Sequence, residues 1–412
     1  MSDDNPLKAP PAVPRRFVLV LGLLTGVAAL SIDMSLPAIP DMVVELGTSH
    51  SLGQQVISLF MIGVGLGQLP AGFLSDRYGR LPVLYVGVTT YTIAGIVTSF
   101  GAQIEIILAA RFFQGLGASV GMVITRAIVR DVASGRQLAR LMSAMVMIFT
   151  ATPMLAPIIG SYLTSLYGWR MNYVAMVVFG FLMIFCISTV LRETHTPSRE
   201  YHIVHQLAMS LREFFSHRRS VFGTLLVMLA AIGFISMITT SAALIIEVFG
   251  VPVQYFGYVF AFSGIGILIG SSLNRVYLRR YTTLRMSGVG AAIAGVAAAQ
   301  LFTIAWLGHA PLWWVWGNVA FFMFGMGFLL PNATSLALDP VPQIAGTASS
   351  LVTALQNLAG SLGSFAAAMI YDGSLSRIVI ILGISGASIA VVFFGFRKAL
   401  LGDRPLRATD EI

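Results

Sequence analysis

Apolar segments recur along the whole chain, each close to the 20 residues that a helix needs to cross a bilayer. We identify twelve of them, at about 16–38, 54–74, 81–100, 104–126, 139–163, 170–191, 221–246, 255–274, 284–306, 312–332, 346–370 and 376–396. A segment that spans a bilayer must satisfy its own backbone N–H and C=O groups, which a helix does. Only 10% of the 412 residues are charged, against about 25% in soluble domains. The sequence therefore predicts an all-α membrane protein with twelve transmembrane helices.

Positive charge is concentrated in one set of the connecting segments. With the N-terminus inside, almost all Lys and Arg residues outside the apolar segments fall on the inner side, and the outer side carries only Arg170 and Arg377. Because inner loops of membrane proteins are enriched in Lys and Arg, this asymmetry predicts that both termini are cytoplasmic. The net charge of +8 then reflects orientation in a lipid bilayer, and we expect no nucleic-acid partner.

One long polar interruption divides the chain. It covers residues 192–220 and leaves six apolar segments on each side. We therefore expect an N-terminal six-helix bundle at 1–191, a cytoplasmic linker at 192–220 and a C-terminal six-helix bundle at 221–412, packed around a central cavity. The linker holds His202 and His205, but no Cys or carboxylate set accompanies them, so we predict no metal site and no cofactor.

A short charged link between the second and third apolar segments reads Gly-Phe-Leu-Ser-Asp-Arg-Tyr-Gly-Arg, from Gly72 to Arg80. An acid at the end of a helix is disfavoured by the helix dipole and needs a cation or another helix N-terminus. We expect Asp76 to pair with Arg126 or Arg130 and to face the start of the eleventh helix near Gly346. The complete set that we expect to control conformation is Gly72, Asp76, Arg77, Gly79, Arg80, Arg126, Arg130, Pro157 and Gly160.

Two charged residues fall inside predicted membrane segments. Asp33 and Arg111 each lie a few residues from a segment centre, on the outer side, and so share the same depth. Ionisable groups at such depth are costly and are functional by default. We predict that Asp33 and Arg111 lie close together and couple transport to protons, with a purely structural ion pair as the alternative. Glu247 and Asp339 are left open as participants.

Other side chains are candidates for lining the cavity. The fifth segment is rich in methionine, whose adaptable side chain suits varied apolar ligands, although ordinary helix packing explains it equally well. The prolines and glycines of the same segment predict a bend at Pro157 and Gly160. The cavity candidates are Gln114, Met145, Phe149, Met154, Phe234, Tyr258, Gln356 and Asn357.

These motifs resemble those of a known transporter family. Gly72–Arg80 resembles the loop between the second and third helices of the major facilitator superfamily, and the run from Arg111 to Gly115 resembles its Arg-x-x-Gln-Gly signature. The run Ala156-Pro-Ile-Ile-Gly-Ser161 resembles the fifth-helix motif of antiporters, with Ala156 and Ser161 in place of glycines. The surroundings of Asp33 and residues 126–143 are similar to those of bicyclomycin and chloramphenicol resistance (Bcr/CflA) exporters.

The resemblance implies a function. Exporters of this kind use a proton gradient to expel small amphiphilic drugs from the bacterial cytoplasm, so the expected partners are drugs, protons and the lipids of the inner membrane, with the protein as a monomer. The alternative is a proton symporter or uniporter for a nutrient or metabolite. A membrane enzyme is disfavoured because the inner loops hold no catalytic cluster and no nucleotide-binding loop.

Overall fold

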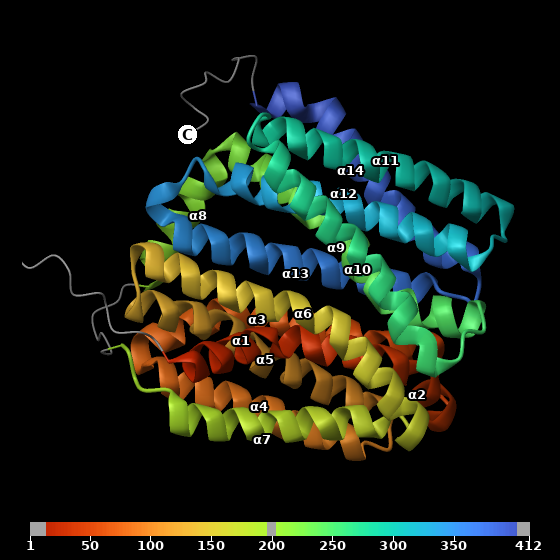
Figure 1. Cartoon of the computed structure of the whole chain (residues 1–412), viewed down its shortest axis with the longest axis horizontal. Coiled ribbons are helices and arrows are strands. Elements are labelled where there is room, and N and C mark those ends of the chain that lie inside the picture. Colours follow the sequence, from red (N-terminus) through yellow and green to blue (C-terminus); the bar gives the residue numbers. More distant parts are fainter. Residues whose placement is uncertain (1–13, 196–202, 402–412) are drawn as a thin grey trace, which may run out of the picture.

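The structure is a computed structural model that describes residues 14–195 and 203–401. Its described residues form helices and no strands: α1 (Arg15–Ser35), η1 (Leu36–Ala38), α2 (Ile39–Leu46), α3 (His50–Tyr78), α4 (Arg80–Phe100), α5 (Ile104–Val132), α6 (Gly135–Tyr167), α7 (Arg170–Val190), α8 (Ile203–Ser216), α9 (Arg218–Ala242), η2 (Ala243–Val248), α10 (Val253–Tyr277), α11 (Thr283–Leu307), α12 (Leu312–Leu338), η3 (Pro342–Ile344), α13 (Ala345–Ile370) and α14 (Leu375–Leu401). The long helices lie side by side along one axis (Figure 1).

Ten helices of the described residues are long and apolar enough to cross a membrane. An eleventh is added when the two parts of α3 count as one span, because α3 bends by 43° between Gln68 and Pro70. Proline at this point removes a backbone hydrogen bond and so permits the bend. The helix α13 is 26 residues long but is not among these spans; it is interrupted by Ser, Thr, Gln and Asn. The all-helical membrane fold is confirmed, and the count of twelve spans stays a prediction.

The helices pack in two groups along the chain. Within residues 15–190, α5 packs on α3 and α4, α1 packs on α6, and α4 packs on α7. Within residues 218–401, α9 packs on α13 and α14, and α12 packs on α10 and α11. The main contacts between the groups are α3 with α13 and α6 with α10. Two pairs of helices therefore connect the parts of the chain that precede and follow α8.

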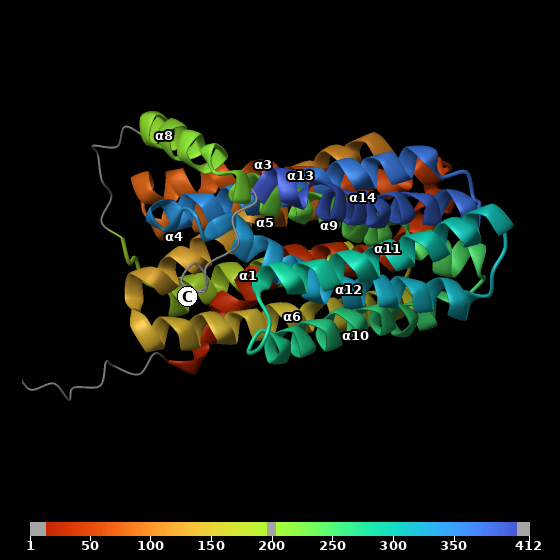
Figure 2. The same cartoon turned by 90° about the horizontal axis from the view of Figure 1, so that it is seen from above.

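The bundle has two distinct ends. The end that carries α8 and the turn between α3 and α4 is called here the α8 end, and the opposite end carries α2 (Figures 1 and 2). The helix α8 lies within the predicted linker, and its Phe214 is fully buried. The rest of the predicted linker includes 196–202, which lies outside the described residues, as do the termini at 1–13 and 402–412.

Candidate functional site

Asp33 is buried near the end of α1, with 3% of its surface exposed. Within the described part of the chain, no hydrogen bond or ion pair to its carboxyl group is found. Asp33 lies seven residues after Gly26, which itself lies four residues after Gly22, so the three residues share one face of α1. A Cβ on Gly26 would lie 3.0 Å from the Thr152 hydroxyl of α6, which shows that this face is turned to α6. Asp33 thus lies on the side of α1 that packs against α6.

Arg111 is fully buried in α5 and is held by neutral groups. Its Nη1 donates to the Gln114 side-chain oxygen at 2.7 Å, and its guanidinium lies 4.2 Å from the ring centre of Phe60 and 5.6 Å from that of Tyr173. Its Nη2 also donates to the backbone oxygen of Ser31 in α1, at 3.4 Å. Arg111 therefore reaches α1 through a carbonyl rather than through a carboxylate.

Asp33 and Arg111 do not form an ion pair within the described residues. The reason is the helical geometry of α1: Ser31, the contact of Arg111, is two residues before Asp33, and residues two apart point in nearly opposite directions. The Ser31 hydroxyl also bonds the Tyr91 hydroxyl of α4 at 2.7 Å, on the same side as Arg111. Arg111 therefore approaches α1 on a different face from the one that carries Asp33.

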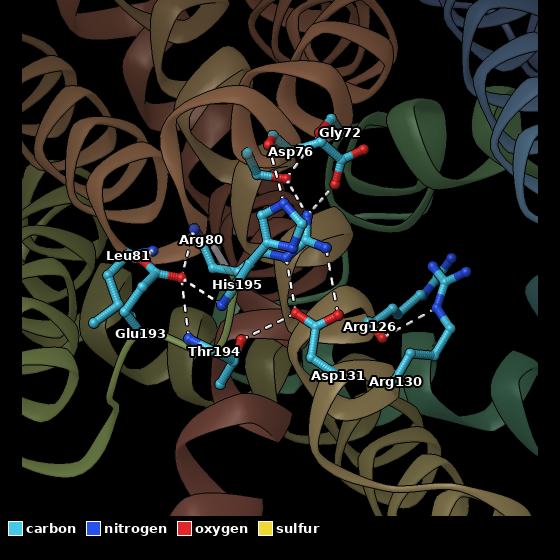
Figure 3. A network of polar contacts seen from close by, with 11 residues as sticks. Gly72, Asp76, Arg80, Leu81, Arg126, Arg130, Asp131, Glu193, Thr194 and His195 are labelled. Carbon is cyan, nitrogen blue, oxygen red and sulfur yellow. Dashed lines mark hydrogen bonds and ion pairs between the residues drawn. The ribbon is translucent and has the colours of Figure 1, made fainter. Parts of the chain in front are cut away.

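Arg80 is the centre of a polar network at the α8 end (Figure 3). Its Nη1 pairs with Asp76 and donates to the Ser75 hydroxyl at 2.9 Å, while its Nε donates to Asp131 of α5 at 2.9 Å. The side chain of Arg80 is only 8% exposed, so these carboxylates and the hydroxyl satisfy a largely buried charge. Arg80 therefore ties the end of α3 to the end of α5 from the start of α4.

Glu193 closes the same network from the segment after α7. Its carboxylate accepts the backbone N–H groups of Arg80 at 3.0 Å and Leu81 at 2.9 Å, at the N-terminus of α4. Burial by itself raises the pKa of Glu193, but the backbone N–H groups of Leu81, Arg80, His195 and Thr194 outweigh it and lower the pKa. A negative charge at a helix N-terminus is also stabilised by the helix dipole.

Gly79 makes this arrangement possible. Its backbone has φ of 98° and ψ of 159°, a region that only glycine adopts readily. A Cβ at this position would also lie 2.9 Å from the Glu193 carboxylate. The glycine is therefore required both by the turn between α3 and α4 and by the approach of Glu193.

The partner predicted for Asp76 was wrong. Its ion pair is with Arg80, four residues along the chain, and Arg126 and Arg130 lie apart from it (Figure 3). Arg130 instead donates to the backbone oxygen of Arg126 at 3.3 Å, and its Nη1 would lie 3.4 Å from a Cβ on Gly346. Arg80 is favoured because it lies four residues from Asp76, across the short turn between α3 and α4. Arg130, rather than Asp76, therefore lies at the start of α13.

The helix α6 meets α10 around Pro157. A Cβ on Gly257 would lie 2.6 to 2.8 Å from the backbone of Pro157 and Ile158, so the two helices touch backbone to backbone. The Ser161 hydroxyl donates to the Pro157 oxygen at 2.7 Å and accepts the Gly257 N–H at 3.2 Å. Gly160 faces the other way and packs on the backbone of Met34 in α1. This stretch of α6 therefore contacts both groups of helices.

The remaining cavity candidates lie in different surroundings. Met145 is buried in an apolar cluster with Leu21 and Leu24 of α1, and Gln114 is committed to Arg111. Tyr258 is half exposed and bonds the Tyr162 hydroxyl of α6 at 3.0 Å. The half-buried candidates are Phe149, Met154, Phe234, Gln356 and Asn357, of which Asn357 lies near Gly65 of α3. Their part in substrate binding stays a prediction.

A cavity of about 270 Å³ opens at the α8 end. It is bordered by α3, α5, α6 and α13, and therefore lies between the two groups of helices. Among the described residues, no group of three His, Cys, Asp or Glu side chains could hold a metal ion.

The model of the Major Facilitator Superfamily matches residues 21–364, which is most of the chain. The chain belongs to the major facilitator superfamily.

Two relatives are named as drug-resistance proteins. The "Bicyclomycin resistance protein homolog" of Haemophilus influenzae is 29% identical over 360 residues, covering 86% of this chain and 90% of the relative. "Multidrug resistance protein D" of Escherichia coli is 30% identical over 373 residues, covering 89% and 93%.

Solved structures show the same fold. A D-xylose–proton symporter matches with a TM-score of 0.74 at 16% identity, over 92% of this chain and 97% of that one. A bacterial homologue of the human lysosomal transporter Spinster, described as inward-facing and unoccupied, matches with a TM-score of 0.73 at 17% identity, over 96% and 100%. The resemblance of this superfamily member to Bcr/CflA-type transporters is confirmed. Its fold and relatives are those of membrane transporters, not of enzymes.

Sequence reasoning missed several members of the site. The Arg80 network also includes Asp131, Thr194 and His195. The Thr194 hydroxyl donates to Asp131 at 3.0 Å, and His195 Nε2 lies 3.0 Å from the backbone oxygen of Asp76. Glu193 and Thr194 follow the sixth predicted helix, but nothing in the sequence indicates the contact of Glu193 with α4. In the sequence, Ser161 is a departure from the antiporter motif, whereas in the structure its hydroxyl accepts the Gly257 N–H of α10.

Proposed function

We propose that this protein is a proton-coupled multidrug efflux antiporter of the bacterial inner membrane, which exports small amphiphilic drugs by alternating access. In this proposal twelve spans form two six-helix halves, at 1–191 and 221–412, and the linker 192–220 joins them. The proposal is supported by the resistance proteins that share 29% and 30% of their sequence with this chain over most of its length.

The observation that carries the proposal is the isolated burial of Asp33. A carboxyl group away from water and without a cation is better accommodated when neutral, so a change in its surroundings is coupled to binding or release of a proton. Because Asp33 faces α6 and α6 contacts α10, movement of the halves against each other would change these surroundings. Asp33 is in this way placed to link proton binding to conformation.

Arg111 takes a different part from the one expected. It is held by Gln114, Phe60 and two backbone carbonyls, so it fixes the packing of α5 on α1 and α3 without directly pairing with the proton carrier. Its positive charge still acts over distance within the bundle, where the low dielectric weakens screening. We propose that Arg111 positions α1, and that Asp33 binds the proton.

The α8 end is proposed to face the cytoplasm, as the distribution of Lys and Arg favours. In that orientation the cavity of about 270 Å³ opens inward. The α2 end holds contacts between the two groups of helices, in which His50 of α3 lies 3.1 Å from Glu247 and the Tyr371 hydroxyl donates to Glu247 at 3.0 Å. These features fit an inward-open state with the outer side closed.

Transport in proteoliposomes tests the proposal. Asp33→Asn permanently mimics the neutral acid, so it should abolish accumulation of bicyclomycin driven by an imposed pH gradient. Exchange of drug for drug without a gradient should persist, because it needs no proton release. The effect on accumulation should be large, since each elementary charge that crosses the membrane contributes about 2.3 kcal/mol per 100 mV of membrane potential.

The control is Asp41→Asn, which removes an exposed acid of α2 in the same part of the bundle. It should keep gradient-driven accumulation. If Asp33→Asn still concentrates the drug, Asp33 is not the proton carrier, and Glu247 becomes the next residue to test. If the wild type moves drug only downhill, the uniporter alternative replaces antiport.

A further inference from the structure

The cavity at the α8 end is unusual in its chemistry. Its lining combines side chains from both groups of helices: Gln68, Met122, Val123, Arg126, Arg130 and Met142 with Ala345, Gly346, Ser349, Ser350 and Thr353. Two of these residues are arginines, and no acidic residue is among them. A cavity between two moving halves is therefore lined by positive charge and by hydrogen-bonding groups.

Arg126 and Arg130 have no acidic partner within residues 14–195 and 203–401. Among the described residues, the ion pairs include neither Arg126 nor Arg130. The acids of the Arg80 network, Asp76 and Asp131, are both engaged by Arg80. Two neighbouring cations one helical turn apart repel each other, and an anion between them would relieve this repulsion.

The N-terminus of α13 opens into the same cavity. The residue before the helix is Ile344, which has no side-chain oxygen, and no side chain caps the first turn. The N–H of Ala345 bonds the Pro342 oxygen, but the next N–H groups have no partner within the helix, and the helix dipole adds partial positive charge at that point. Ala345 and Gly346 of this turn line the cavity, and Arg130 Nη1 would lie 3.4 Å from a Cβ on Gly346.

Gln68 provides an independent sign of a ligand. It is 4% exposed and lines the cavity from α3. In the part of the chain that the structure describes, no hydrogen bond to its side chain is found. Its amide group borders the cavity, and the NH₂ can donate to an oxygen there.

We propose that this cavity binds an oxyanion, with Arg126, Arg130, the N-terminus of α13 and Gln68 as its ligands. Carboxylate, phosphate and sulfonate groups share the required chemistry, because arginine binds their paired oxygens in a planar fork and helix N-termini bind the same anions. The oxyanion belongs either to a soluble solute or to the headgroup of a lipid of the inner leaflet.

Binding would connect the two halves. Arg126 and Arg130 belong to α5, whereas the helix N-terminus belongs to α13, so a bound anion attracts both sides of the cavity. It should therefore favour states in which the α8 end is narrower. This site is independent of the proton coupling proposed above, because its occupancy needs no transport.

The test measures protection of a thiol in the cavity. Ser349→Cys is introduced into a Cys186→Ser background, because Cys186 is the only native cysteine. The full-length protein in dodecyl maltoside is labelled with a maleimide while inorganic phosphate replaces chloride at constant ionic strength. Labelling should slow by the factor one plus the ratio of phosphate to Kd, or about threefold at twice the Kd.

Variants identify the ligands. Arg126→Gln and Arg130→Gln should each lose the protection, as should Gly346→Asp, which places a carboxylate beside Arg130 and at a position that stabilises the helix N-terminus. Arg285→Gln, an exposed arginine in the first turn of α11, should keep it. Asp33→Asn should also keep it, so that failure of this proposal and failure of proton coupling are distinguished.

Lipid composition identifies the source of the anion. If the ligand is a lipid headgroup, the thiol is protected without phosphate in nanodiscs of phosphatidylglycerol, but not in nanodiscs of phosphatidylcholine. If the ligand is a soluble anion, protection requires phosphate in both. The proposal is overturned if neither phosphate nor phosphatidylglycerol slows labelling, or if the protection is unchanged in Arg126→Gln, Arg130→Gln and Gly346→Asp.

Discussion

Arg111 is a full charge held by a side-chain amide, backbone oxygens and two aromatic rings. Arg111→Lys keeps the charge but replaces a planar fork of five donors by a single ammonium group. Hydrogen bonds from charged groups are worth about 1.5–3 kcal/mol each, so we expect a loss of about 2 kcal/mol and a lower Tm in detergent. Arg275→Lys, at an exposed position near the end of α10, should leave the Tm unchanged. Equal effects in the two variants would contradict this role.

Glu193 makes stability depend on pH. Its pKa is lowered in the folded protein, although burial alone raises it, because backbone N–H groups stabilise the carboxylate. The stabilisation is therefore complete above the unfolded pKa and is lost as the pH falls through the lowered folded pKa. The Tm difference between the wild type and Glu193→Gln should be largest at neutral pH and should shrink in acid. A difference that is constant across this range would exclude the carboxylate as its cause.

The pair Asp33 and Arg111 marks the limit of sequence reasoning at this scale. Depth follows from counting residues at 1.5 Å each, and both residues are buried as expected. The face of a helix depends on rotation, and a shift of two residues turns a side chain to the opposite side. Ser31 rather than Asp33 points to Arg111, and only the packing of α1 between α5 and α6 decides this.

At the scale of the helix, the contact of α6 with α10 depends on the absence of a side chain at Gly257. Gly257→Ala would press a methyl group to within 2.6 Å of the Ile158 backbone, which cannot withdraw as a side chain could. Overpacking of this kind costs about 1–3 kcal/mol, so we expect a lower Tm and slower drug export. Gly264→Ala on the same helix meets nothing within 4 Å and should behave like the wild type. A normal Gly257→Ala variant would show that α6 and α10 separate without cost.

The turn between α3 and α4 shows what a motif predicts and what it leaves out. The glycine spacing indicated the turn correctly, and Gly79 has the positive φ that explains its presence. The further partners of Arg80 come from α5 and from the segment after α7, more than 50 residues away. Several arginines could have satisfied Asp76, and the choice of Arg80 follows from the short turn, not from the charge pattern.

At the scale of the whole molecule, the polar composition of α13 reflects the position of this helix in the bundle. The helix packs on α3 and α9 in the middle of the bundle, with Ser364 bonded to Ser58 at 2.6 Å and to Thr239 at 2.7 Å. A helix with neighbours on most sides does not need a lipid-compatible surface, which explains why hydropathy alone does not select it. Length and apolar composition therefore predict the all-helical fold, whereas the positions of the helices in the bundle depend on contacts between distant segments.

The closure of the α2 end depends on a small cluster that joins the two groups of helices. His50 of α3 contacts Glu247 at 3.1 Å and lies edge-on to the Tyr371 ring, with centres 6.0 Å apart, while the Tyr371 hydroxyl donates to Glu247. Burial raises the pKa of Tyr371, and the neighbouring negative charge of Glu247 raises it further. Tyr371 therefore remains a hydrogen-bond donor at neutral pH. His50→Ala removes the link from α3, and Tyr371→Phe removes only the hydroxyl. Both should loosen this end.

Distances between spin labels measure the loosening without transport. In the Cys186→Ser background, labels at the exposed positions Val44 and Trp306 report the separation of the two groups of helices at this end. Each hydrogen bond that a variant removes is worth about 0.5–1.5 kcal/mol, enough to shift a two-state population by roughly two- to tenfold. We therefore expect a larger fraction of long distances in both variants, with the greater effect for His50→Ala because it removes both the contact with Glu247 and the ring contact. His309→Ala, an exposed histidine after α11 that bonds only its own loop in the described chain, should give the wild-type distribution. Unchanged distances in both test variants would mean that the apolar packing between α3 and α13 holds this end closed by itself.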